Sequence, residues 1–230
     1  MTIRTHRLRF PLSAEDARSL RAGDQLILDG EIVVTAGLPT HQRLLQALDG
    51  AEPLPLELHD GCLFHIGSYS QEHQTDEADQ ADPEAPAGPD RSGSGFEVLY
   101  INPTTSTRFN PYMPTLIRRL NLHAVGGKGG LDAASVEAMR EVGCVYLSFL
   151  GGGCTLLSQA LRGVLEVGWP DMLTHYRVVR LKVEGLGPVT VAIDAHGNSC
   201  YADAAAHARS HMATILAELD QRRQEAARAG

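Results

Sequence analysis

Three short stretches carry the residues best suited to chemistry, and each follows a predicted strand. In residues 104–108, "TTSTR", hydroxyls can donate hydrogen bonds and an arginine can hold a carboxylate through two parallel bonds. In residues 126–130, "GGKGG", glycines let the backbone approach a ligand and Lys128 adds a positive charge. In residues 151–156, "GGGCTL", free amides at a helix start favour negative charge. Together they indicate a site for a small carboxylate or phosphate.

Each stretch alone also has an ordinary structural explanation. A Ser/Thr-rich turn often caps its own backbone, a lysine between glycines is often solvated, and a glycine-rich helix start is often a tight turn. The sequence has no GxxxxGK[ST] phosphate loop, no GxGxxG after its first strand and no GxSxG elbow, which disfavours nucleotide binding and acyl chemistry. His41, His65 and His196 are candidate acids or bases, with an ordinary hydrogen-bonded histidine as the alternative for each.

Composition narrows the class of protein. The chain has 230 residues and is 43% hydrophobic, which is enough for a substantial core. Its formal charge of −8 argues against nucleic acid or an anionic membrane as the main partner. No stretch approaches the roughly 18 apolar residues of a membrane span, and the start lacks the apolar region of a signal peptide, so we expect a cytoplasmic protein with no membrane partner.

The cysteines do not suggest a metal site. Cys62, Cys144, Cys154 and Cys200 lie far apart, without a CxxC pair or a histidine at zinc-ligand spacing. We expect buried free thiols in a reducing compartment and no metal bound by this chain.

The elements that would position these residues follow an alternating order. Strands are predicted at residues 62–67, 96–101, 123–126 and 144–150, and helices lie between the last three at about 113–120 and 132–142. This alternation indicates the α/β class. Two hairpins are also predicted, one turning at Asp29-Gly30 and one around Gly185 and Gly187.

The ends of the first two helices are also marked in the sequence. Ser13 is a candidate N-cap for a short helix that stops near Gly23, and Thr40 is a candidate N-cap for a helix that closes at Gly50. The later helix at about 132–142 is expected to begin behind Asp132.

We expect residues 1–230 to form a single domain with two special segments. Residues 71–95 contain seven acidic residues and no large apolar side chain, which predicts a disordered acidic loop. Residues 202–227 predict a C-terminal helix. Its inner stripe would include Ala206, Met212, Ile215 and Leu216.

Taken together, the motifs resemble a known family. The ordered set "PTTSTRFNPY", "VGGKGG", "FLGGGCTLLSQAL", "VGWPD" and "GPVTVAIDAHGN" resembles the β subunit, or C-terminal domain, of class I fumarate hydratase and L-tartrate dehydratase, from about residue 8 to 205. The resemblance implies an α/β fold, namely a swivelling three-layer β/β/α domain with a mixed sheet. It also implies a reversible hydro-lyase that removes water from a fumarate/malate-like or tartrate-like 2-hydroxy dicarboxylic acid.

The resemblance further implies a division of labour between subunits. A partner α subunit would carry a [4Fe-4S] cluster, so this chain alone would bind no cofactor, and the assembly would be a hetero-oligomer or a homodimer. By position, Thr104 matches the threonine of proton abstraction, Arg108 a carboxylate-binding arginine, Lys128 the lysine of the glycine loop and His41 the histidine that closes "RDxxH". Further expected substrate-binding residues are Thr105, Ser106, Gly127 and Gly129. Because a threonine alone is a poor base, Thr104 would need a charged neighbour.

One departure from the family pattern concerns the substrate. Gly37 and Leu38 stand where the family has arginine and aspartate, so one carboxylate clamp is missing. An unpaired buried carboxylate would cost on the order of several kcal/mol. We therefore expect an acid less symmetric than tartrate, with a neutral or apolar group facing Gly37 and Leu38. The alternatives are a non-catalytic carboxylate-binding or assembly module of the same fold, and a stand-alone enzyme without a cluster.

Overall fold

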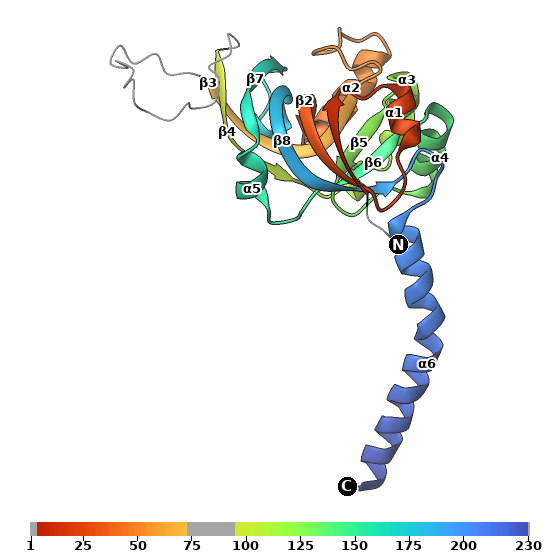
Figure 1. The fold of residues 1–230 in the computed structure, drawn as a ribbon. Helices are drawn as coiled ribbons and strands as arrows, with labels where there is room; N and C mark the ends of the chain where they lie inside the picture. Colours follow the sequence, from red (N-terminus) through yellow and green to blue (C-terminus); the bar gives the residue numbers. More distant parts are fainter. Residues whose placement is uncertain (1–3, 73–94, 230) are drawn as a thin grey trace.

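The computed structural model describes residues 4–72 and 95–229, and within them the chain is a mixed α/β protein whose sheet closes into a barrel (Figure 1). The eight strands are β1 (Thr5–Phe10), β2 (Gln25–Thr35), β3 (Cys62–Glu72), β4 (Phe96–Pro103), β5 (Ala124–Gly127), β6 (Val145–Ser148), β7 (Leu161–Gly168) and β8 (Val178–Ile193). Strands β1, β2, β3, β5 and β6 are parallel neighbours. Strand β8 pairs antiparallel with β6, β7 and β2, and the β2 pairing closes the sheet. The predicted α/β class is confirmed, and the swivelling three-layer arrangement stays a prediction.

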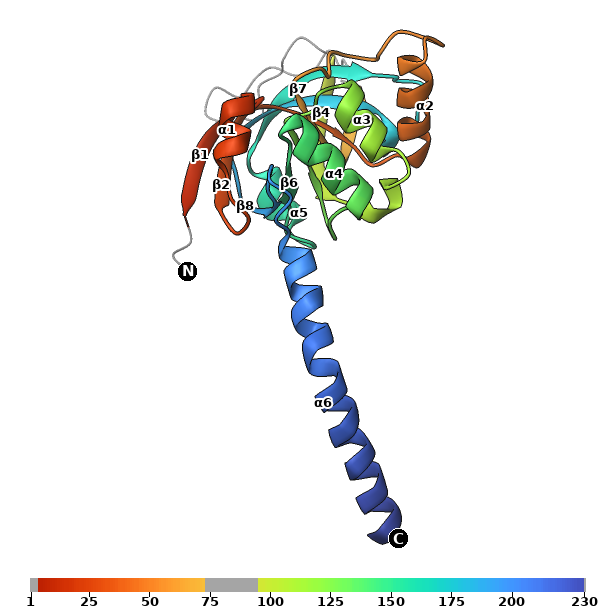
Figure 2. The same ribbon diagram turned by 90° about the vertical axis from the view of Figure 1, so that its right-hand side faces the viewer.

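Alternation along the strands divides the buried residues into two clusters. In β3, Phe64 and Ile66 belong to the cluster enclosed by the strands, whereas Leu63 belongs to the cluster beneath the helices. Successive side chains of a strand point to opposite faces, so a strand buried on both sides is apolar throughout. The second cluster is covered by α2 (Leu38–Leu48), α3 (Met113–Arg119) and α4 (Ala133–Val142), and Figure 2 shows α3 and α4 side by side across this face.

The hairpin predicted at Asp29-Gly30 is wrong, because β2 runs straight through these residues. Gly30 has φ of +99° and abuts the neighbouring strand, where a Cβ would overlap the carbonyl oxygen of Phe10. Asp29 accepts hydrogen bonds from Arg7 and from the amide of Gly185. The pair therefore makes an irregularity in the β2–β8 register and not a turn.

The second predicted hairpin is also wrong, since β8 is one strand of 16 residues. At Gly187, with φ of +151°, a Cβ would lie 2.6 Å from the carbonyl oxygen of Leu26. The glycine thus allows β8 to approach β2 closely, and the strand bends to pair with three neighbours. Strands β1 and β7 were not predicted from the sequence.

The helix caps agree with the sequence in two of three cases. The Ser13 hydroxyl accepts a bond from the Asp16 amide at the start of α1 (Ala14–Ser19), and Asp132 caps α4 in the same way. Helix α2 instead begins behind Gly37, and Thr40 donates its hydroxyl hydrogen to the carbonyl oxygen of Tyr176. The remaining short helices are η1 (Ser106–Phe109), α5 (Cys154–Ser158) and η2 (Thr174–Tyr176).

The C-terminal helix α6 (Cys200–Ala229) projects away from the barrel (Figures 1 and 2). Its expected inner stripe is wrong, because Met212, Ile215 and Leu216 are all more than half exposed. No described helix is both long enough and apolar enough to cross a membrane.

The acidic loop predicted for residues 71–95 begins too early, because β3 continues through Glu72. Residues 73–94 of that prediction lie outside the described part of the chain.

Candidate functional site

A hollow of about 290 Å³ lies where several strand ends meet. Its volume is close to the lower limit of small-molecule sites, as a small metabolite requires. Two predicted site residues, Thr104 and Lys128, line it from the loops after β4 and β5. The other lining residues are Ala36, Gly67, Ser68, Tyr69, Tyr100, Asn102, Pro103 and His175.

Backbone hydrogen bonds join the loops that carry Thr104 and Lys128. The Lys128 amide donates to the Thr104 carbonyl oxygen over 2.9 Å, and the Ser106 amide donates to the Lys128 carbonyl oxygen over 2.8 Å. Gly127 permits this approach: its φ is +152°, and a Cβ there would overlap Ser106 Oγ and lie 3.0 Å from His65 Cβ. These backbone bonds hold the two loops together, so that the Thr104 hydroxyl and the Lys128 ammonium extend from neighbouring positions.

Arg108 provides the charged neighbour that Thr104 needs. One turn of η1 brings the guanidinium back, so that Nη2 donates to Thr104 Oγ1 and Nε lies 3.5 Å from the Thr105 carbonyl oxygen. A hydrogen bond from a fixed cation to a hydroxyl oxygen favours the deprotonated form of that hydroxyl. Thr104 is half-buried whereas Arg108 is exposed, so the guanidinium can also reach a carboxylate at the edge of the hollow.

The third glycine loop lies beside the other two. A Cβ at Gly151 would be 3.2 Å from Lys128 Cδ, so this glycine leaves room for the lysine stem. Gly129 is exposed next to Lys128, with φ of +82°. Helix α5 has only five residues, so its dipole contributes little to anion binding.

Ser106 faces the interior instead of the hollow. Its hydroxyl is fully buried and hydrogen-bonds His65 Nδ1 and the Tyr146 hydroxyl, each over 2.8 Å. The Tyr146 oxygen also accepts from the Gly130 amide. Burial lowers the pKa of His65 well below its ordinary value and raises the pKa of Tyr146. This neutral network supports the Thr104 and Lys128 loops from behind.

His41 is likewise buried and does not line the hollow. Its ring stacks on Phe109 at 4.1 Å, and Nδ1 lies 2.6 Å from the Gly37 carbonyl oxygen. Its Nε2 has no hydrogen-bond partner among the described residues. Burial lowers the pKa of His41 to about 4, so the ring is neutral at pH 7. His196 lies elsewhere, with Nε2 at 3.0 Å from the Arg18 carbonyl oxygen.

Five polar residues of the hollow were not predicted from the sequence, namely Ser68, Tyr69, Tyr100, Asn102 and His175. Tyr69 and Tyr100 are directly opposite each other in the β3–β4 ladder, with stacked rings 5.4 Å apart, and Asn102 follows on β4. Extending the β3 alternation beyond residue 67 would have found Tyr69. No local signal identifies His175, because it reaches the hollow from η2, more than forty residues after Lys128 in the chain.

The donor set of the described residues does not fit an iron-sulfur cluster. No three His, Cys, Asp or Glu side chains gather as a metal site among residues 4–72 and 95–229. Cys62 and Cys144 are buried, and burial raises the pKa of Cys62 to about 12 and that of Cys144 further. Thiolates, the form that binds iron, are therefore disfavoured at both positions.

Comparison with known proteins identifies the same family that the sequence motifs resemble. Residues 86–204 match the family described as "Fumarase C-terminus". Over 83% of its length the chain is 30% identical to "Putative L(+)-tartrate dehydratase subunit beta" of Methanocaldococcus jannaschii, covering 88% of that protein. It is 26% identical to "L(+)-tartrate dehydratase subunit beta" of Escherichia coli K12, with 85% of this chain and 86% of that one covered. It is also 29% identical over 85% of its length to "Putative fumarate hydratase class I" of Geobacillus stearothermophilus, of which it spans 33%.

Proposed function

Because the chain belongs to the Fumarase C-terminus family, we propose that it is the β subunit of a heteromeric hydro-lyase that reversibly dehydrates a hydroxy acid. The names of its tartrate dehydratase relatives support the β-subunit assignment. The observation that carries the proposal is the trio of Thr104, Arg108 and Lys128: Thr104 and Lys128 line one hollow and are joined by a backbone bond, and Arg108 bonds the Thr104 hydroxyl.

The chemistry of dehydration matches what this trio can supply. Removing a proton α to a carboxylate places negative charge on that carboxylate in the transition state. Lys128 would hold the charged carboxylate as it gains electron density, and Thr104 would take the proton, a role that its hydrogen bond from Arg108 supports. His41 and Ser106 would support the loops and not touch the substrate, because both are buried behind the loops.

The partner and cofactor are further parts of this proposal. We infer an α subunit that carries the [4Fe-4S] cluster, because the donors of this chain do not fit one and the relatives named as β subunits imply a second subunit. The substrate is proposed to be a hydroxy acid altered from tartrate or malate, because residue 37 carries no guanidinium.

The test is turnover by the reconstituted complex. The chain would be co-expressed with a cysteine-bearing partner subunit, assembled without oxygen and supplied with a panel of hydroxy acids. Lys128→Ala should lower kcat/KM by about 10- to 100-fold, as the loss of a charge-assisted hydrogen bond predicts. The exposed Lys182 on β8 offers a matched control, and Lys182→Ala should behave like the parent.

Either of two results would contradict the proposal. One is a complex with its cluster intact that turns over none of the acids. The other is turnover that Lys128→Ala leaves unchanged.

A second function is favoured by the missing guanidinium at residue 37. The chain would then be a non-catalytic carboxylate-binding or assembly module of the same fold. In that case small acids would raise the thermal midpoint of the chain through Lys128 and Arg108, whereas the assembled complex would show no turnover.

A further inference from the structure

The space that a side chain at residue 37 would need is already occupied. Gly37 is buried at the start of α2, and a Cβ there would overlap Thr40 Oγ1 and lie 2.9 Å from Tyr176 Cβ. The absence of an arginine at residue 37 therefore leaves no empty space in the structure. Residues 169–177, which we call the pocket wall, stand in its place. A group of the ligand therefore cannot face Gly37, contrary to the expectation from the sequence.

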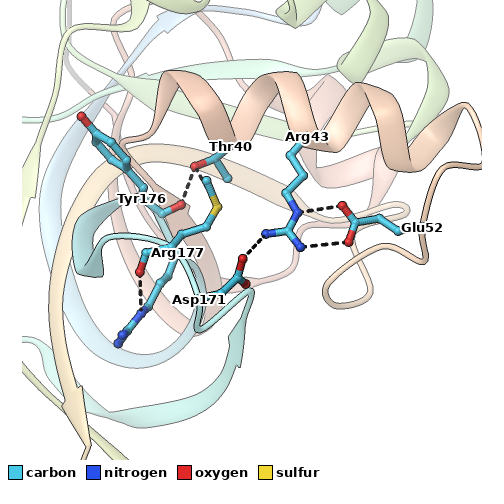
Figure 3. Close-up of polar contacts among 7 residues, drawn as sticks. Thr40, Arg43, Glu52, Asp171, Tyr176 and Arg177 are labelled. Atoms are coloured by element: carbon cyan, nitrogen blue, oxygen red, sulfur yellow. Dashed lines mark hydrogen bonds and ion pairs between the residues drawn. The ribbon is translucent and has the colours of Figure 1, made fainter.

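Hydrogen bonds hold the pocket wall against the end of β2 and the start of α2. The Tyr176 carbonyl oxygen accepts from the Thr40 hydroxyl and, over 3.2 Å, from the Thr35 hydroxyl. The His175 carbonyl oxygen accepts from the Ala36 amide over 3.1 Å. Figure 3 shows the Thr40 bond to Tyr176 at the first turn of α2.

Contacts of two arginines fix the two ends of the wall, and Figure 3 shows Arg43 bonded to Asp171 and Glu52 at one of them. Arg43 of α2 bonds Asp171 over 2.8 Å and Glu52 over 2.7 Å, and its guanidinium lies 4.5 Å above the Trp169 ring. At the other end, Arg177 donates to the Ser70 carbonyl oxygen over 3.2 Å. The wall is thus anchored on both sides of η2, which carries His175.

His175 is the wall residue that lines the hollow. Its ring packs edge-on against the Tyr176 ring, with centroids 4.6 Å apart and planes at 75°. Gly67 of β3 lies beside it, since a Cβ there would be at the ordinary contact distance of 3.5 Å from His175 Cβ. An anchored backbone and a packed ring hold the imidazole at the edge of the hollow, where a ligand can meet it.

The positive charges at the hollow gather at one end of it. Among the described residues that line it, only Lys128 carries a permanent charge, and Arg108 reaches the same end through its bond to Thr104. The other polar side chains, including His175 and Asn102, offer hydrogen-bonding groups without a permanent charge. An acid with a carboxylate at each end would leave one carboxylate without a cation, which costs binding energy.

We propose that His175 recognises the end of the ligand remote from Lys128, and that the site selects a hydroxy acid of about malate's size with one free carboxylate and one neutral, hydrogen-bonding end such as a carboxamide. This inference rests on the proposed function, since it names the substrate class of the same site.

The test is calorimetric binding of three probes to the full chain: L-malate and the two monoamides of malic acid. The parent should bind at least one monoamide about tenfold more tightly than malate, a ratio typical of one well-placed polar group. His175→Ala should lose that preference, His175→Asn should keep part of it, and His175→Arg, which adds a guanidinium, should prefer malate. His59→Ala is the matched control, because His59 is exposed and lies outside the hollow.

The outcomes separate this inference from the proposed function. If Lys128→Ala weakens binding of every probe while His175→Ala keeps the parent's preference, the inference is overturned and the acid site stands. A parent that prefers malate, or binds no probe, also overturns it. If Lys128→Ala alters the binding of no probe, the acid site is wrong, and the proposed function fails with it. An unchanged thermal midpoint of each variant shows that folding is intact.

Discussion

At the scale of single residues, the site depends on a contact between Arg108 and Thr104. The two lie four positions apart, and η1 returns the guanidinium to the threonine hydroxyl. Four hydroxyl residues in this stretch look equivalent in the sequence, yet they have different surroundings. Thr104 lines the hollow, whereas the Ser106 hydroxyl points inward to His65 and Tyr146. The chemistry therefore depends on which way each hydroxyl points.

The buried histidines predict a pH dependence of stability. The pKa of His41 is lowered by burial from 6.5 to about 4, so between these values the unfolded chain binds a proton that the folded chain does not. Stability should therefore be full above pH 6.5 and fall as the pH drops towards 4. For His41 the loss between pH 7.5 and pH 5 is about 2 kcal/mol, and His65 adds to it in the same direction.

Urea unfolding at pH 7.5 and pH 5 measures this loss. His41→Gln keeps a donor for the Gly37 carbonyl oxygen and should reduce the pH dependence by about 2 kcal/mol. The exposed His59 serves as the control, since His59→Gln should show the parent's dependence. An unchanged dependence in His41→Gln would mean that folding does not lower the pKa of this ring.

At the scale of elements, the contact between α2 and the pocket wall decides the shape of the hollow. Helix α2 has no side-chain cap, and its Thr40 hydroxyl bonds the wall instead of its own backbone. Tight packing at Gly37 brings the two segments together. A glycine at residue 37 is thus required by the packing of this protein. It also removes the positive charge that the family pattern has at this position.

Gly37→Ala tests this packing directly. The added Cβ would overlap Thr40 Oγ1, so we expect a loss of about 1–3 kcal/mol in unfolding free energy, as for other overpacked sites. Thr40→Ala removes the overlapping oxygen, so the double variant should be less destabilised than the sum of the single variants. Additive losses in urea unfolding would show that the overlap with Thr40 is not the cause.

At the scale of the whole molecule, the barrel and the C-terminal helix are nearly independent. Every side chain from Ala206 to Ala227 is exposed, whereas Tyr201, near the start of α6, packs on the body and donates to Ser148 Oγ over 2.9 Å. The family match ends at residue 204, close to where the body ends. The packed body of the proposed single domain therefore ends before Ala206, where the exposed stretch of α6 begins.

Truncation of the chain tests this independence. Removal of the residues after Ala206 should change the unfolding free energy of the body by less than about 0.5 kcal/mol, because the side chains from His207 to Ala227 are all on the surface. A shorter chain that ends at Ser199 also loses Tyr201 and should unfold at a lower temperature. A large loss on the first truncation would show that the helix packs against something in solution.

The sequence by itself determined the α/β class, the caps at Ser13 and Asp132, and the three glycine or hydroxyl loops. These follow from local periodicity and from residue types that act on their own backbone. Local patterns failed at Asp29-Gly30 and Gly187, where glycines allow strands to approach closely instead of forming turns.

Only the tertiary structure decided which residues share the hollow. It joined Thr104 and Lys128 through backbone bonds, turned Ser106 and His41 inward, and brought His175 to the hollow from a distant part of the chain. The physical reason is that these placements depend on closure of the sheet by β8 and on packing at Gly37. Both involve contacts between residues far apart in the chain, which a local pattern does not encode.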